Sequence, residues 1–432
     1  MSSRRQFIAG LGTLGVAGLA GCSGLPLVGD EQPDRPDFDV PIGAIPAIES
    51  PASPFPVSVP DSLADSHRER ATELLDRVPA APSIPNGAVA EELRSDRERV
   101  ANRLESESDE PWALDALSWW RARRGSAANI AGAYRAAIGE NDPSGLVERR
   151  RTVREDLGSF TADHDYRADS VREAVLVHAP IEGLLSLSRR RASPDPGYPD
   201  DPIAEPFRAG DAVERVEVAA ATLADARRLK DTHLADRSAV PTQWGALIDA
   251  TDRLRFAVSE TKEPVRGFLD AGLDAFDRDL DLTPAYELFT VAAPQTRSSE
   301  NAFHERRDKG SHATAVIEAG ETLAALEAFR TAIEGIQDGG YQEDVTIQSL
   351  ERTARRAKDA IDAIRTAEYG SLAAMIGRPA LSSYESVPGR IEEGYADPLR
   401  MQGELAWIEL YARTVPSAAE FVVERLDATG NG

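Results

Sequence analysis

Side chains that commonly bind metals recur at every fourth position near the middle of the chain: Glu300, His304, Asp308 and His312. On one continuous helix such residues share a slowly drifting face, and carboxylate and imidazole groups together can hold a borderline metal ion. The alternative is a solvated face of neighbouring charge pairs, which the adjacent basic residues favour. We expect no bound metal and keep these four residues as the metal-ligand candidates.

A second group surrounds Pro180, which interrupts an apolar, helix-forming stretch. A proline inside a helix bends the axis and leaves one carbonyl without its usual donor. His178 precedes this proline, and Glu182 lies one turn after His178. Two interpretations are open: both side chains line a pocket, or His178 is simply hydrogen-bonded in the core.

Two adjacent indoles form the third candidate. Trp119 and Trp120 fall in a predicted helix, where successive side chains point about 100° apart. We therefore expect one indole in the core and the other partly exposed. The exposed one either forms a binding platform in a pocket or completes the core.

Other chemistry lacks its signature in this sequence. None of the four lysines follows a glycine, which excludes a Walker-type phosphate loop, and no serine has the flanking glycines of a nucleophile elbow. The His-Glu-x-x-His and Glu-x-x-His metal motifs are also absent. We expect no cofactor and favour a protein that is not an enzyme.

The glycine-rich N-terminal stretch contains GLGTLG, which spells a dinucleotide-binding fingerprint. That fingerprint needs a buried strand before it, and the residues before its first glycine are too few and too polar. The stretch instead resembles an export signal. Arg4 and Arg5, followed by Phe7, resemble the twin-arginine motif. The apolar run up to Gly21 has the length of the apolar region of a signal peptide and is too short to span a bilayer.

The signal ends in Leu19-Ala20-Gly21-Cys22, which resembles a lipobox. The whole stretch resembles the signal of haloarchaeal-type lipoproteins that the twin-arginine machinery exports. The resemblance implies that residues 1–21 are a signal peptide and that Cys22 is lipidated, which would anchor the protein at the extracytoplasmic face of the cell membrane. The alternative for Cys22, the only cysteine, is an ordinary buried thiol.

The composition is strongly acidic, with 73 acidic and 49 basic residues and a formal charge of −24. Abundant carboxylates with only four lysines resemble the proteins of salt-loving archaea. At molar salt the Debye length is about 3 Å, so repulsion between surface charges is screened. An ordinary acidic protein is the alternative. This charge disfavours nucleic-acid binding, which needs a basic face.

Prolines are concentrated between Ser23 and Pro60, which predicts an extended tether over residues 22–60. Apolar residues within it, including Ile45 and Phe55, allow part of the tether to lie against the body. After Pro60 the apolar residues recur in steps of three and four, as in helices. We expect an all-α body over residues 61–432, built as a multi-helix bundle of long antiparallel helices.

The expected helices cover residues 62–78, 88–105, 112–138, 145–160, 170–190, 207–236, 242–260, 264–280, 284–306, 316–336, 350–364 and 387–427, some of them broken by proline. Residues 316–336 and 350–364 are predicted to form one antiparallel hairpin. Short similarities about 190 residues apart indicate two related halves, 61–238 and 239–432. Chance similarity between alanine-rich and arginine-rich helices is the other explanation. A groove between two halves is a natural binding place.

These observations favour a membrane-anchored, extracytoplasmic helical lipoprotein that acts as a binding or scaffold protein at the cell surface. Its ligand or partner protein is left open. The alternative is a helical-bundle enzyme or metal-binding protein, with its site near His178 or at the Glu300–His312 candidates. A deep polar pocket with converging histidines favours this alternative, whereas a single apolar surface patch favours a protein partner.

Overall fold

The computed structural model describes residues 36, 38–235, 237 and 239–429, so Arg4, Arg5, Cys22 and the predicted signal peptide lie outside the described residues. The described residues are all-α, as predicted, and contain no β-strand. Their one isolated β-bridge joins Arg167 to Thr242. In this part of the chain, no helix combines the length and the apolar character that crossing a membrane requires.

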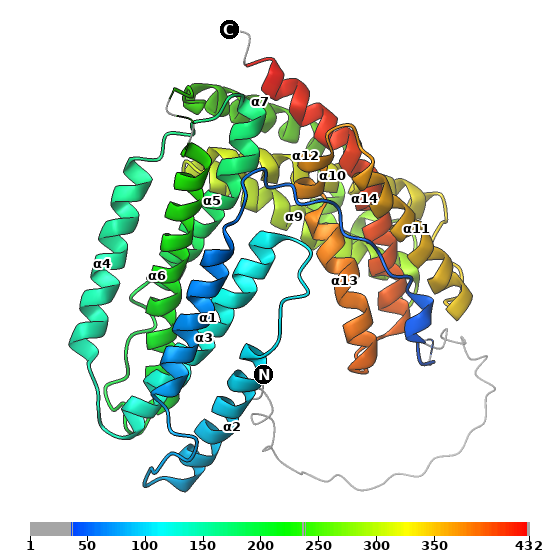
Figure 1. The fold of residues 1–432 in the computed structure, drawn as a ribbon. Helices are drawn as coiled ribbons and strands as arrows, with labels where there is room; N and C mark the ends of the chain where they lie inside the picture. Colours follow the sequence, from blue (N-terminus) through cyan, green and yellow to red (C-terminus); the bar gives the residue numbers. More distant parts are fainter. Residues whose placement is uncertain (1–35, 37, 236, 238, 430–432) are drawn as a thin grey trace, which may run out of the picture. The chain divides into compact units, whose positions relative to one another are not determined.

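Fourteen α-helices span the described residues (Figure 1). The first six are α1 (Asp61–Asp76), α2 (Gly87–Leu104), α3 (Ala113–Ala137), α4 (Pro143–Ala162), α5 (Val171–Arg191) and α6 (Pro206–Leu234). The others are α7 (Trp244–Lys262), α8 (Arg266–Ala271), α9 (Pro284–Asp308), α10 (His312–Gln337), α11 (Ile347–Arg365), α12 (Gly370–Ile376), α13 (Arg378–Glu392) and α14 (Pro398–Asp427). Short 3₁₀ turns cover Ile42–Ala44, Glu263–Val265 and Gly272–Ala275.

Several helices begin at residue types that stabilise or tolerate a helix N-terminus. Thr346 caps α11 by accepting a hydrogen bond from the backbone N–H of Ser349, whose side chain accepts from the Thr346 N–H in return. The two longest helices, α6 and α14, both have proline as their first residue, Pro206 and Pro398, where the missing N–H costs nothing. Pro206-Phe207-Arg208 and Pro398-Leu399-Arg400 are 192 positions apart and form one of the short similarities that indicate two halves.

Most expected helices are confirmed, and two expectations need correction. Residues 264–280 contain only the short α8 between 3₁₀ turns. The expected helix over 387–427 is wrong, because the chain forms α13 and α14 separately. Gly394 has φ 73°, a left-handed conformation that glycine adopts freely and that ends α13.

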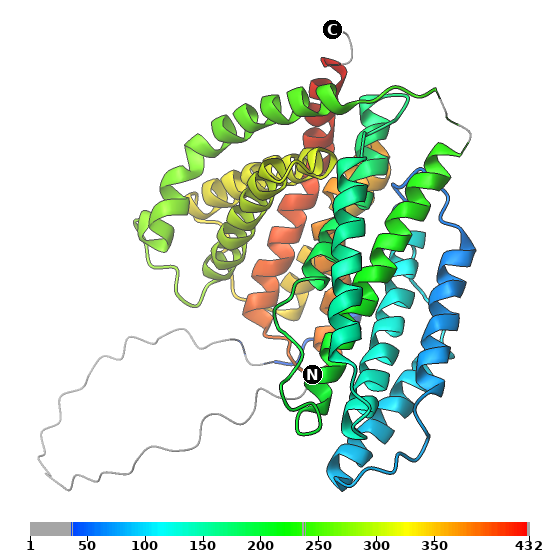
Figure 2. The ribbon, with the colours of Figure 1, turned by 90° about the vertical axis from the view of Figure 1, so that its left-hand side faces the viewer.

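Two long helices organise the packing. α6 packs against α3, α4 and α5, while α1 and α2 pack on α3. α14 packs against α9, α10 and α11, and α5 joins the two groups by packing on α10. Figures 1 and 2 show the long helices of the first group running side by side. The predicted hairpin of α10 and α11 is wrong, because α11 packs mainly on α14, and α10 packs on α9 and α14.

Residues 38–60 lie along the body, so this part of the predicted tether is not a free spacer. Ala44, Ile45 and Phe55 are buried in the core. Two buried side chains bind the backbone of this segment: the Trp112 indole donates to the Pro51 carbonyl at 2.8 Å, and the Tyr384 hydroxyl donates to the Pro46 carbonyl at 2.8 Å. Pro46 and Pro51 lie outside any helix or strand, so their carbonyls are available to accept from side chains.

Candidate functional site

The metal-ligand candidates do not share one helix face. α9 ends at Asp308, and His312 begins α10 after Gly310, which has φ 72°. Glu300 accepts hydrogen bonds at 2.8 Å from Lys262, and His304 lies 3.8 Å from Glu300. In the described ranges, no three or more histidine, cysteine, aspartate or glutamate side chains are placed to hold a metal ion.

His178 lies in an aromatic cluster that brings together four of the six histidines. His164 is 4.9 Å from His178 between ring centroids, and His233 is 5.8 Å from His178. His312 joins the cluster through Tyr166, at 6.4 Å. His178 and His233 each place Nε2 about 3 Å from the same backbone carbonyl, that of Arg167. The cluster therefore links α5, α6 and α10 to the loop before α5.

Glu182 links this cluster by hydrogen bonds to α10, which belongs to the group of helices around α14. Its carboxylate accepts hydrogen bonds from the Tyr166 hydroxyl and, at 2.6 Å, from the backbone N–H of Thr314 on α10. Burial raises the pKa of Glu182 to about 7, although these hydrogen bonds oppose the shift. His178 is fully buried and Glu182 is 5% exposed, so both face other helices rather than an open pocket.

The buried histidines predict sensitivity to acid. Burial lowers the pKa of His164 to about 3 and that of His178 to about 4, from 6.5. The unfolded chain therefore binds more protons than the folded chain below about pH 6.5, and this part of the stability is lost as the pH falls toward 4. Glu182 has the opposite sign: its raised pKa favours folding at low pH, and this contribution is lost as the pH rises through 7.

We expect His164→Phe to reduce the acid sensitivity. Neither ring nitrogen of His164 has a hydrogen-bond partner among the described residues, and its ring packs between Phe160 and Tyr166, so phenylalanine suits the position. Melting temperatures measured at about pH 7 and about pH 5 should fall less in this variant than in the wild type. His304→Phe, at a partly exposed position, is the control. Equal losses in all three proteins would contradict the prediction.

Trp119 and Trp120 differ in burial, as expected. Trp120 is buried, with the Arg68 guanidinium 4.3 Å from its ring centroid. Trp119 is half-buried and forms part of the wall of an open pocket of about 330 Å³. Of the pocket candidates predicted from the sequence, Trp119 is the one that lines this pocket.

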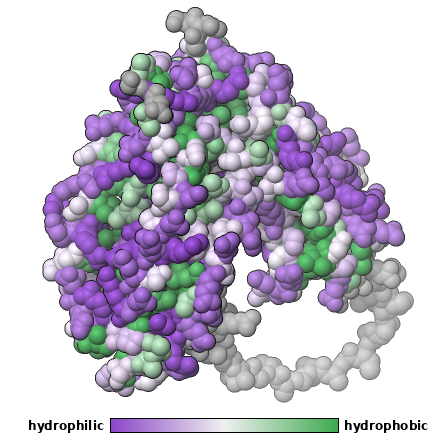
Figure 3. All heavy atoms as spheres, in the orientation of Figure 1, coloured by the Kyte–Doolittle hydropathy of each residue, from purple (hydrophilic) through white to green (hydrophobic). Residues whose placement is uncertain are grey.

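This cavity, which we call the tryptophan pocket, is built by segments far apart in the sequence. Its wall includes Ser50, Glu110, Trp112, Asp115, Trp119, Arg378 and Glu385. Figure 3 shows the surface hollowed between the side that carries α3 and the side that carries α13, with a largely hydrophilic rim. A neighbouring hollow of about 610 Å³ shares several of these residues and adds Glu107, Asp109 and Arg123.

The polar groups of the tryptophan pocket are held in place. Arg378 forms an ion pair with Asp115 and lies 5.0 Å from the ring centroid of Trp112. The Ser50 hydroxyl donates to Glu385 at 3.3 Å. Burial raises the pKa of Glu385, and the nearby carboxylates of Glu110 and Asp115 raise it further. The pocket therefore concentrates negative charge beside two indoles.

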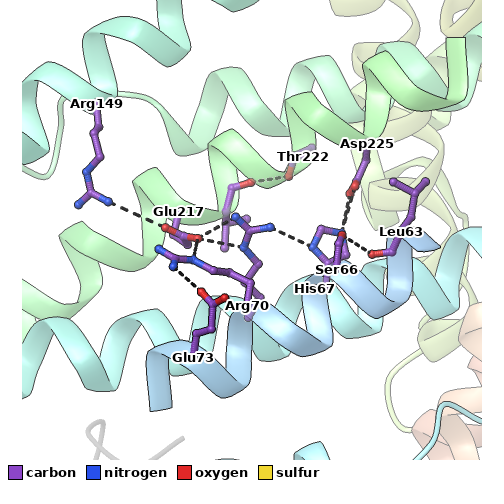
Figure 4. Close-up of polar contacts among 11 residues, drawn as sticks. Leu63, Ser66, His67, Arg70, Glu73, Arg149, Glu217, Thr222 and Asp225 are labelled. Atoms are coloured by element: carbon purple, nitrogen blue, oxygen red, sulfur yellow. Dashed lines mark hydrogen bonds and ion pairs between the residues drawn. The ribbon is translucent and has the colours of Figure 1, made fainter. Parts of the chain in front are cut away.

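The first group of helices contains a buried charge network that was not predicted from the sequence (Figure 4). His67 on α1 contacts Asp225 on α6 at 3.0 Å, and Arg121 on α3 forms an ion pair with the same carboxylate at 2.7 Å. Glu217, two turns before Asp225, accepts from Arg70 and Arg124. The one sequence signal was the eight-residue spacing of Glu217 and Asp225, which places both on one face of α6.

Two family models match the chain. Residues 62–239 match a domain of unknown function, DUF8262, and residues 244–424 match a second domain of unknown function, DUF8264. No protein of curated function matches, and neither does any solved structure. The tryptophan pocket takes Trp112 and Trp119 from the first matched range and Arg378 and Glu385 from the second.

Proposed function

We propose that this protein is a lipid-anchored binding protein at the extracytoplasmic face of the cell membrane, and that the tryptophan pocket holds its ligand. The observation that supports binding is the pocket itself: two separately matched domains and the segment around Ser50 meet there to form one wall. Small-molecule sites commonly lie at such domain boundaries and combine aromatic walls with a few polar groups. The lining of the pocket combines two indoles with several carboxylates and one guanidinium group, which supports a binding role.

The location rests on the sequence of the N-terminus. The twin-arginine-like pair Arg4 and Arg5 supports export of the folded chain, and the lipobox-like sequence supports lipidation of Cys22 after removal of residues 1–21. The acidic composition suits a protein that works at high salt. A second protein is the alternative partner of such a surface-anchored body.

We expect Cys22→Ser to release the protein from the membrane. The serine hydroxyl cannot form the thioether that carries the lipid, so the variant should move from the membrane fraction to the soluble fraction, or keep its signal peptide. Fractionation in native salt and the intact mass of the wild-type protein measure this. A wild-type protein that retains residues 1–21 and carries no lipid would overturn the proposed location.

A further inference from the structure

We propose that the tryptophan pocket binds a small organic cation that carries an ammonium or guanidinium group. This inference rests on the proposed function and names the ligand class. Together, the pocket and its neighbouring hollow contain five carboxylates against two guanidinium groups. The carboxylates are those of Glu107, Asp109, Glu110, Asp115 and Glu385, and the guanidinium groups are those of Arg123 and Arg378.

Among the described residues, two carboxylates of the pocket form no ion pair, and the charge of Arg378 only partly offsets the raised pKa of Glu385. Arg378 is engaged by Asp115 and by the Trp112 ring. Within the part of the chain that the structure describes, neither Glu110 nor Glu385 forms an ion pair, and Glu385 accepts only the Ser50 hydroxyl. Because these carboxylates repel one another, a ligand cation between them would be attracted, whereas an anion would be repelled.

The aromatic wall suits the same ligand. Trp119 borders both hollows, and the Arg123 guanidinium already lies over its ring. Trp112 has the guanidinium of Arg378 over its ring in the same way. Indole rings attract cations through their electron-rich faces, more strongly where water is partly excluded. The guanidinium groups of the protein itself therefore already lie against both indoles, so this wall accepts cations of the proposed type.

A bare metal ion fits this pocket poorly. No three acidic or histidine side chains among the described residues converge on one point. The positive group must therefore donate hydrogen bonds to separate carboxylates, as ammonium and guanidinium groups do. The volume of about 330 Å³ is in the range of small-molecule sites, so an organic body attached to the cation can be accommodated.

Calorimetric titration of the full chain with three probes of similar shape tests the ligand class. Phenylguanidine carries the cation, phenylurea is its neutral counterpart, and benzoate is an anion. We expect phenylguanidine to bind at least tenfold more tightly than the other two, and its affinity to fall as salt is raised. Absence of phenylguanidine binding at low and high salt would overturn the inference.

Matched variants locate the binding. Glu110→Gln and Glu385→Gln should each weaken phenylguanidine binding about tenfold, because each removes a charge-assisted hydrogen bond. Glu392→Gln, at an exposed position of α13 outside the pocket, should leave it unchanged. Equal affinities in all variants would place the probe elsewhere and overturn the inference. If phenylurea or benzoate bound more tightly than phenylguanidine, and Trp119→Leu abolished that binding, the pocket would be a binding site but not one for cations. The membrane fractionation tests the proposed location separately.

Discussion

Replacing Asp225 by asparagine is expected to lower the free energy of unfolding by about 3–5 kcal/mol. Asp225 is 1% exposed and its carboxylate neutralises Arg121, which is 4% exposed. Asparagine keeps the size of the side chain but removes its charge. The guanidinium of Arg121 is then left buried without a counter-ion, which costs far more than the loss of one surface ion pair.

Urea unfolding at constant salt, followed by circular dichroism, measures this loss. Asp231→Asn is the matched control, because Asp231 lies on the same helix, α6, at an exposed position, and should change stability by no more than about 0.5 kcal/mol. The double variant Arg121→Met/Asp225→Asn removes both charges and should recover part of the stability. An unchanged unfolding midpoint for Asp225→Asn alone would show that the network contributes little.

The helices were largely predictable because their signals are local. In α11, Leu350, Ala354, Ala357, Ile361 and Ile364 form one apolar stripe, and all five are buried. The choice of packing partner was not predictable in the same way. An apolar stripe predicts that a helix face is buried, but it does not identify the helix that covers this face. Here α14, which follows later in the chain, packs against both α10 and α11.

The candidate site was predictable only in part, for a related reason. Trp119 stood out by its residue type, but Arg378 and Glu385 are ordinary charged residues of a helix. They become pocket residues because α13 faces α3, and the bond from Ser50 to Glu385 joins residues 335 positions apart. The Asp225 network is similar, since His67 and Asp225 lie 158 positions apart. Only the tertiary structure brings such residues together.

Replacing Gly403 by alanine is expected to destabilise the protein by about 2 kcal/mol, although alanine is the better helix former. Gly403 lies on α14 where this helix crosses α9. A Cβ atom there would lie 2.6 Å from the backbone nitrogen of Leu288 and 2.7 Å from the backbone carbonyl carbon of Glu287. Because these are backbone atoms, relief requires α9 and α14 to move apart, which loosens the packing around both helices.

Gly158→Ala provides the matched control with the opposite sign. Gly158 lies within α4, and nothing lies within 4 Å of a Cβ built there, so alanine should stabilise the protein by about 0.5–1 kcal/mol through its helix propensity. Urea unfolding of both variants separates the two effects. If Gly403→Ala were as stable as Gly158→Ala, the α9–α14 crossing would have to be looser than described. Opposite signs would show that a glycine in this chain is required by close helix contact in one place and merely tolerated in another.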